Sequence, residues 1–173
     1  PAAGQSAVSV TSDAQDGING AAAGQSIALV TKTAGDIVIT RDLVTVAGDI
    51  ALVAASNINL ANDITTGSAS NGALVDLIAQ SSRIDRTAGT VTSGKVAVAA
   101  TGGIGLATAG NRLQTSTSNL QIGGLNIQAQ GAGAASAVTN SGDDFIENVG
   151  PVAVQVAGVN ANGDIDVTQD GAN

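Results

Sequence analysis

The sequence predicts an all-β protein, a parallel β-helix of about seven coils, each of roughly 23 residues with three short strands. Residues 48–60 and 95–106 repeat the same pattern at a constant offset of 46 residues. In this alignment Ile50, Leu52, Ala54, Ile58 and Leu60 fall on Val96, Val98, Ala100, Ile104 and Leu106. Similar apolar pairs at 27–29 and 75–77 show that the repeat length is about half of this offset, roughly 23 residues. Apolar residues alternate with small or polar ones in every copy, which is the period of a strand.

Taken in order, residues 1–26 are expected to form a weak first coil or a frayed N-terminal cap, because only Val8 and Val10 alternate there. Regular coils are expected over 27–130, a loop leaving the coil over 131–151, and a last, incomplete coil over 152–173. We expect Phe145 to lie against the side of the stack. The predicted strands are 27–29, 37–39, 44–46, 50–52, 58–60, 64–66, 75–77, those around Ile84 and Val91, 96–98, 104–106, those around Leu113 and Val138, 120–122, 125–127, 152–156 and 165–167.

The triplet Gly-Asp-Ile begins several of these strands, at 35–37, 48–50 and 163–165. Glycine permits the bend, aspartate can hydrogen-bond neighbouring backbone, and isoleucine turns inward to start the strand. Equal cycles with turn residues at matching places favour stacked coils over a sandwich, whose hairpins would reverse the strand direction.

The composition agrees with a narrow aliphatic interior. The 173 residues include no Cys, His, Met, Trp or Tyr, and Phe145 is the single aromatic. A wide core normally uses large aromatic side chains. Stacked rows of Ala, Val, Ile and Leu suit a narrow one.

The charge makes nucleic acid an unexpected partner. Lys plus Arg number 6 against 14 Asp plus Glu, a net charge of −8, whereas phosphate binding needs clustered cations. No apolar run reaches the ~18 residues of a membrane span. The chain starts at Pro1 without an initiating Met, so we expect a processed product or a piece of a longer protein.

One set of motifs resembles a known family. It comprises Gly103-Ile104-Gly105, the segment 110–115 (GNRLQT), the segment 118–120 (SNL) and the segment 138–142 (VTNSG). These segments, with the coils at 48–67 and 89–110, are similar to the filamentous-haemagglutinin-like, β-strand-repeat adhesins of bacterial surfaces. The resemblance covers 27 to the C-terminus. It implies a right-handed β-helix in a secreted, cell-surface rod used for adhesion or matrix building. The Asn-Pro motif of that family's secretion region has no match here.

Catalytic chemistry has few candidates in this chain. Without His or Cys, Ser-His-Asp centres, Cys-His centres and the usual zinc sites are excluded. Asp143 and Asp144 are the candidate acid/base pair, with Arg112 or Lys95 to bind a sugar acid. The alternative for the pair is a solvated turn in a Gly/Ser loop. We expect no enzyme, and predict no catalytic, cofactor-binding or metal residues and no cofactor.

Three other patterns have a functional and a structural explanation. Asn160, Asn162, Asp164 and Asp166 place oxygen ligands at alternate positions, which suits calcium, but a turn feeding a strand explains them as well. The Thr pairs at 31–33, 90–92 and 115–117 suggest an ice-binding ladder but hold no common place in the repeat, so β-propensity explains them. Arg83, Asp85 and Arg86 are expected to form a solvated charge patch.

The function that the sequence favours is a non-catalytic structural segment of an extracellular bacterial adhesin, surface fibre or matrix filament. The alternative is a polysaccharide-binding or polysaccharide-cleaving β-helix module. Terminal coils present unpaired strand edges. The expected partner is therefore a second copy or the continuation of a longer chain, besides glycans or proteins of a host or matrix.

Overall fold

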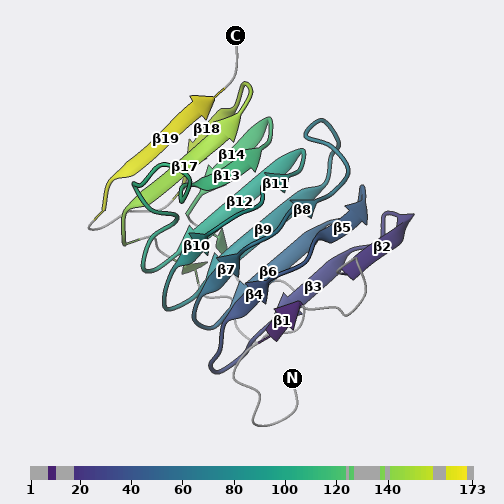
Figure 1. Ribbon diagram of the computed structural model, residues 1–173, viewed down its shortest axis with the longest axis horizontal. Helices are drawn as coiled ribbons and strands as arrows, with labels where there is room; N and C mark the ends of the chain where they lie inside the picture. The colour runs from purple at the N-terminus through teal and green to yellow at the C-terminus, as the bar shows by residue number, and fades with distance from the viewer. Residues whose placement is uncertain are drawn as a thin grey trace.

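The computed structural model describes residues 8–10, 18–123, 125–126, 137–138, 141–157 and 163–170. The chain winds as a parallel β-solenoid with three strands per coil and no helix in the described part (Figure 1). Successive coils build three parallel sheets, with the strands of residues 18–23 and 27–30 at one end of the stack and those of residues 153–156 and 165–170 at the other. The predicted parallel β-helix is confirmed.

Each sheet takes at most one strand from each successive coil. The first contains β1 (Val8–Val10), β4 (Ile37–Ile39), β7 (Ile58–Leu60) and β10 (Ile84–Arg86). The second contains β2 (Ile18–Ala23), β5 (Leu43–Val46), β8 (Ile64–Thr65), β11 (Val91–Thr92), β13 (Leu113–Ser116), β17 (Asp144–Val149) and β19 (Ile165–Asp170). The third contains β3 (Ile27–Val30), β6 (Ile50–Ala54), β9 (Leu74–Ala79), β12 (Lys95–Ala100), β14 (Asn119–Ile122) and β18 (Ala153–Val156).

The register of the third sheet confirms the predicted interior column. Ile27 pairs with Ile50, Ile50 with Val75, and Val75 with Val96. The column continues through Leu120 to Val154. A one-residue slip would turn every side chain of a strand to the other face, so the shared register keeps the apolar residues of all coils inside.

The number of turns is smaller than predicted. The described part of the chain makes about five turns, not seven. Its longest sheet stacks seven strands, which span about 29 Å at ~4.8 Å per step. The chain advances only one coil between Leu120 and Val154. In that interval β15 (Leu125–Asn126) and β16 (Ala137–Val138) pair antiparallel in a separate small sheet.

Aliphatic side chains fill the interior in a single cluster. In the first sheet one column runs through Ile37, Ile58, Ile84 and Ile104, all fully buried. A second, smaller cluster, Val53, Ile78 and Ala99, lies on the opposite side of the third sheet. The β15 strand contacts β12, the strand that contributes Ala99 to this cluster.

The corner between the second and third sheets has a polar interior. Thr45, Thr66, Ser93 and Thr117 succeed one another in register and are buried. The Thr66 hydroxyl donates to Ser93 Oγ at 2.9 Å, and the Ser93 hydroxyl donates to the Ala73 carbonyl at 2.8 Å. Every hydroxyl of this column has a hydrogen-bond acceptor, which removes the cost of burying it.

At the outer corners, carboxylate and amide oxygens link successive coils. Asp36 Oδ1 accepts from the backbone N–H of Asn57 at 2.9 Å, and Asp49 Oδ1 accepts from that of Leu74 at 2.9 Å. Asp63 accepts from Thr90 N–H in the same way. The aspartates of the first two Gly-Asp-Ile triplets thus accept hydrogen bonds from the next coil, whereas the prediction was a bond to neighbouring backbone. The isoleucines of those triplets, Ile37 and Ile50, are buried as expected.

The segment around Ile104 departs from the sequence alignment. Ile104 is buried in its column, but Leu106 is 44% exposed although it was aligned with the buried Leu60. The chain leaves the coil at Gly105, where φ is +62°, and returns at Leu113. A Cβ on Gly105 would lie 2.4 Å from the Phe145 carbonyl oxygen. Glycine is therefore required both for the bend and for the approach of the next coil.

The loop predicted over 131–151 ends earlier than expected. Residues 144–149 form β17, which pairs with β13 and β19 as part of the solenoid. Phe145 belongs to this strand and is half-buried on its outer side.

Candidate functional site

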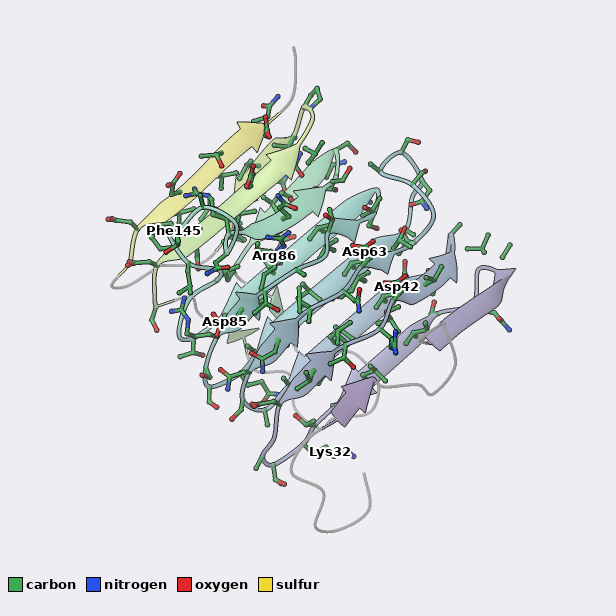
Figure 2. All side chains as sticks on the ribbon, in the orientation of Figure 1. Lys32, Asp42, Asp63, Asp85, Arg86 and Phe145 are labelled. Carbon is green, nitrogen blue, oxygen red and sulfur yellow. The ribbon has the colours of Figure 1, made fainter. Side chains whose placement is uncertain are left out.

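Two arginines hold the excursion between Gly105 and Leu113 against the coils. The guanidinium of Arg83 donates to the carbonyls of Gly102 and Gly105 and pairs with Asp85 at 3.1 Å. Arg86 donates to the Gly110 carbonyl at 2.6 Å and to Gln114 Oε1 at 2.8 Å. The patch predicted to be solvated therefore consists of contacts that fix this excursion to the coils. Asp85 and Arg86 are labelled in Figure 2.

The electrostatic surroundings of Arg86 fit this role. Burial lowers the pKa of its guanidinium, and the carboxylates of Glu147 and Asp63 oppose that shift. A guanidinium stays charged in any case and offers several donors in a planar fork. One arginine can therefore hold several carbonyls that belong to the next coil.

Arg112 forms a second cluster on the same side. Its Nη2 lies 2.8 Å from Asp166 Oδ2 and also donates to the Asp166 carbonyl at 3.1 Å. The guanidinium carbon lies 5.5 Å from the centre of the Phe145 ring, within the range of a cation–π contact. This cluster joins β17 and β19 to the returning excursion.

The candidate acid/base pair does not share one environment. Asp144 is fully buried and occupies the interior column after Ile104, with which it forms a parallel bridge. Asp143 is exposed, and its Oδ1 accepts from the Asp164 N–H at 3.0 Å. Adjacent residues of an extended strand point to opposite sides. The two carboxylates are therefore not arranged side by side for acid/base work.

The cations proposed to accompany them are also apart. Arg112 lies against Phe145 and Asp166, whereas Lys95 lies on the outer face of the third sheet at the start of β12.

The proposed calcium ligands are only partly described. Asn160 and Asn162 lie outside the described residues. Asp164 is exposed, and Asp166 is paired with Arg112. Among the residues that the structure describes, no three acidic side chains come together as a metal site would need.

The Thr pairs form no flat outer ladder. Thr31, Thr115 and Thr117 are buried, while Thr33 is exposed. Thr31 accepts from the Ala55 N–H at 2.7 Å and donates to the Gly35 carbonyl at 2.9 Å, so it closes a corner of the coil.

One end of the stack exposes apolar side chains that hold interior register positions. Val154 and Val156 hold interior register positions after Leu120 and Ile122, yet they are 41% and 55% exposed. Within the described part of the chain, β18 pairs only with β14 and β19 only with β17. We call this surface, β18 with β19, the C-terminal edge.

At the opposite end of the stack, β2 and β3 are the terminal strands of the same two sheets. β3 pairs only with β6 among the described strands, and β2 only with β5. Ile27 and Leu29 of β3 stand at the start of the interior columns that end at the C-terminal edge, and they are only partly buried.

The alternating pattern of 152–156 and its place in a last, incomplete coil were both predicted from the sequence. The number of coils before it was not, because the chain advances only one coil between Leu120 and Val154. The clusters of Arg83, Arg86 and Arg112 were also missed, because their carbonyl partners belong to an excursion that only the structure defines.

Comparison with protein-family models, curated proteins and solved structures gave no significant match. The parallel solenoid is compatible with the β-helical repeat proteins that the sequence motifs resemble. Among the described residues, there is no helix with the length and hydropathy to cross a bilayer.

Proposed function

We propose that this chain is a non-catalytic structural segment of an extracellular bacterial fibre, of the adhesin or matrix-filament kind. Its terminal strands pair with a further coil, supplied by a second copy or by the same polypeptide. The role is mechanical: a stiff rod gives reach and surface.

The observation that carries the proposal is the unbroken register of the third sheet. One interior column passes through six strands, from Ile27 to Val154, without a change of direction. Load along the axis is then carried by backbone hydrogen bonds between coils, while the aliphatic columns hold the register.

The C-terminal edge supports growth of the stack. A further coil placed on β18 would cover Val154 and Val156 and pair the free side of the strand. Covering two half-exposed valines contributes about 2 kcal/mol in total, from ~1.5–3 kcal/mol for complete burial of each. Unpaired edges of this kind associate readily with another strand.

The adhesin-like identity and the extracellular location come from the motif resemblance around Gly103–Thr115. The absence of His and Cys agrees with a non-catalytic role. A polysaccharide-depolymerisation assay discriminates the enzymatic alternative. We expect no cleavage by the chain. Activity that is lost in Asp143→Asn or Asp144→Asn would contradict the proposal.

Light scattering at increasing concentrations of the isolated chain tests the edge pairing. We expect oligomers that grow by whole subunits, and a return to monomer in the double variant Val154→Glu/Val156→Glu. The matched control is Ala107→Glu/Thr108→Glu, which adds the same charge at exposed positions of the excursion. A chain that stays monomeric at the highest concentration, or equal effects of both variants, would rule out pairing between copies.

A further inference from the structure

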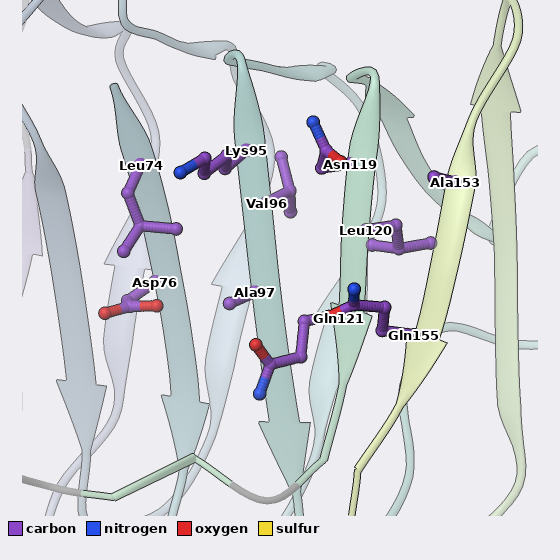
Figure 3. A pocket seen from close by; sticks show the side chains of 10 residues that line it. All are labelled: Leu74, Asp76, Lys95, Val96, Ala97, Asn119, Leu120, Gln121, Ala153 and Gln155. Atoms are coloured by element: carbon purple, nitrogen blue, oxygen red, sulfur yellow. The ribbon is translucent and has the colours of Figure 1, made fainter. Parts of the chain in front are cut away.

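A groove of about 450 Å³ lies on the outer face of the third sheet, across β9, β12, β14 and β18 (Figure 3). It has a simple cause in the sequence. Ala97 stands between Asp76 and Gln121 in one row of the sheet, and Ala153 stands beside Asn119 in the next row. The two small residues leave a hollow between longer side chains.

The groove runs along the solenoid axis. Asp76, Ala97, Gln121 and Gln155 come from four successive strands in register, so they form one row at ~4.8 Å per step. Leu74, Lys95, Asn119 and Ala153 form a parallel row two residues away along the strands. A ligand that follows the groove therefore meets a new coil at each step.

Several polar groups in this groove are available to a ligand. The side chains of Asp76, Lys95 and Gln155 have no hydrogen-bond or ion-pair partner within the described part of the chain. Gln121 donates to the Gly123 carbonyl at a long 3.3 Å, which leaves its oxygen free to accept. Burial, with the nearby Asp49, raises the pKa of Asp76 to about 6.

These groups select the charge of the ligand. Asp76 opposes a polyanion, as does the net charge of −8, and Lys95 opposes a polycation. Amide side chains both donate and accept hydrogen bonds. A carboxyl and an ammonium group add one strong acceptor and one strong donor. A chain of hydroxyl groups, each a donor and an acceptor, satisfies this set without any net charge.

We propose that the groove binds a neutral polysaccharide chain laid along the solenoid axis, with Asp76, Lys95, Gln121 and Gln155 contacting its hydroxyl groups. The groove has no aromatic ring for a sugar to stack on. Binding therefore depends on hydrogen bonds and is weak for a short oligosaccharide, in the millimolar range. Binding in the groove needs no second copy of the chain, because all of its lining residues lie on one side of a single chain.

Chemical-shift titration of the ¹⁵N-labelled chain tests the proposal, with cellohexaose as the neutral probe. We expect shifts of the side-chain amide signals of Asn119, Gln121 and Gln155, and no shift of Asn57, which bonds to Asp36 at a different corner. Hexagalacturonate and hexalysine serve as acidic and basic probes. Larger shifts with either charged probe, or none with cellohexaose and a neutral mannohexaose, would overturn the assignment.

Variants separate specific binding from a general effect. Gln121→Ala/Gln155→Ala should weaken binding by roughly 5- to 150-fold, since two hydrogen bonds to the ligand are lost. Ala97→Gln keeps every polar group and fills the hollow, so it should abolish the shifts of Asn119. Gln80→Ala, which removes an amide outside the groove, is the matched control. Unchanged affinity in the first two variants, with circular dichroism showing them folded, would refute the proposal.

Discussion

Replacing Asn148 with leucine should destabilise the C-terminal turns by about 3–6 kcal/mol, even though leucine is the more apolar residue. Asn148 is fully buried in the interior of the second sheet. Its Oδ1 accepts from the Thr115 hydroxyl at 2.7 Å and from the Thr117 N–H at 3.1 Å. Its Nδ2 donates to the carbonyls of Thr117 and Gly150 at 3.1 and 3.0 Å.

The magnitude follows from these contacts. Each hydrogen bond contributes ~1 kcal/mol net, and the Thr117 N–H, buried without a partner, costs a further ~1–3 kcal/mol. Burial of the new apolar side chain offsets ~1–2 kcal/mol. The two side chains have the same branched shape, so no cavity forms, and the larger methyl groups of leucine can only add to the cost.

Urea unfolding followed by far-ultraviolet circular dichroism measures the change, because the chain has no Trp or Tyr to give a useful fluorescence signal. Thr115→Val should cost about 1 kcal/mol. The double variant should be less destabilised than the sum of the two by about 1 kcal/mol, since the pair is then absent from both sides. Hydrogen exchange localises the effect to the amide of Thr117. A neutral or stabilising Asn148→Leu, or full protection of that amide in the variant, would refute the reasoning.

Three further predictions follow from other positions. Ile104→Asp should unfold the chain or lower the unfolding free energy by more than about 4 kcal/mol, because it places a charge in the dry column next to buried Asp144. The control, Leu106→Asp at an exposed position, should change the unfolding free energy by less than about 0.5 kcal/mol. Similar losses of stability in both variants would contradict the assigned register. Ala47→Gly should stabilise the chain by about 0.5–1 kcal/mol, since Ala47 has a φ of +59°; a lower melting temperature would contradict this. Asp76→Asn should leave the unfolding free energy nearly unchanged at pH 3 and raise it at pH 8 by up to about 3 kcal/mol. The reason is that the folded state raises the pKa of Asp76 to about 6, so that stability present at low pH is lost as the pH rises through that value. Denaturant titrations at both pH values measure the difference, and a gain that is equal at the two values would count against the burial of this carboxyl.

The interior columns were predictable because their signal is periodic and repeated. Ile27, Ile50, Val96 and Leu120 recur at similar spacings with the same alternation, and each copy supports the alignment of the others. A parallel register then follows, since the residues of a column must all face inward for any one of them to be buried. The length of each coil could vary by a few residues without disturbing this pattern.

The excursions were less predictable, because a loop that leaves the coil can carry apolar residues of its own. Leu106 continued the alternation of the strand before it, although the backbone turns outward at Gly105. The same difficulty affects Asp144. Nothing in its sequence neighbours marks it as the successor of Ile104 in an interior column, because 40 residues separate the paired positions.

The groove was hidden for a different reason. The alternation in 74–79, 95–100 and 119–122 already places Asp76, Ala97 and Gln121 on the outer face. A hollow, however, arises from the relative size of neighbours on adjacent strands, which requires the register of each pair. Gln155 pairs in register with Gln121 although 34 residues separate them. No repeat length predicts this pairing.

The polar contacts give the stack a specificity that its aliphatic columns cannot provide. Isoleucine, leucine and valine in successive coils are nearly interchangeable, so a coil displaced by one repeat would bury a similar apolar area. The hydrogen bonds are not interchangeable: Asn148 fits the coil that offers Thr115 and Thr117, and Arg86 fits the one that offers Gly110 and Gln114. A displaced coil would leave the buried groups of Asn148, Thr115 and Thr117 without partners, at ~1–3 kcal/mol for each group, and would also break the contacts of Arg86. Burial therefore makes the solenoid stable, while the few interior and corner polar residues determine which coil lies on which.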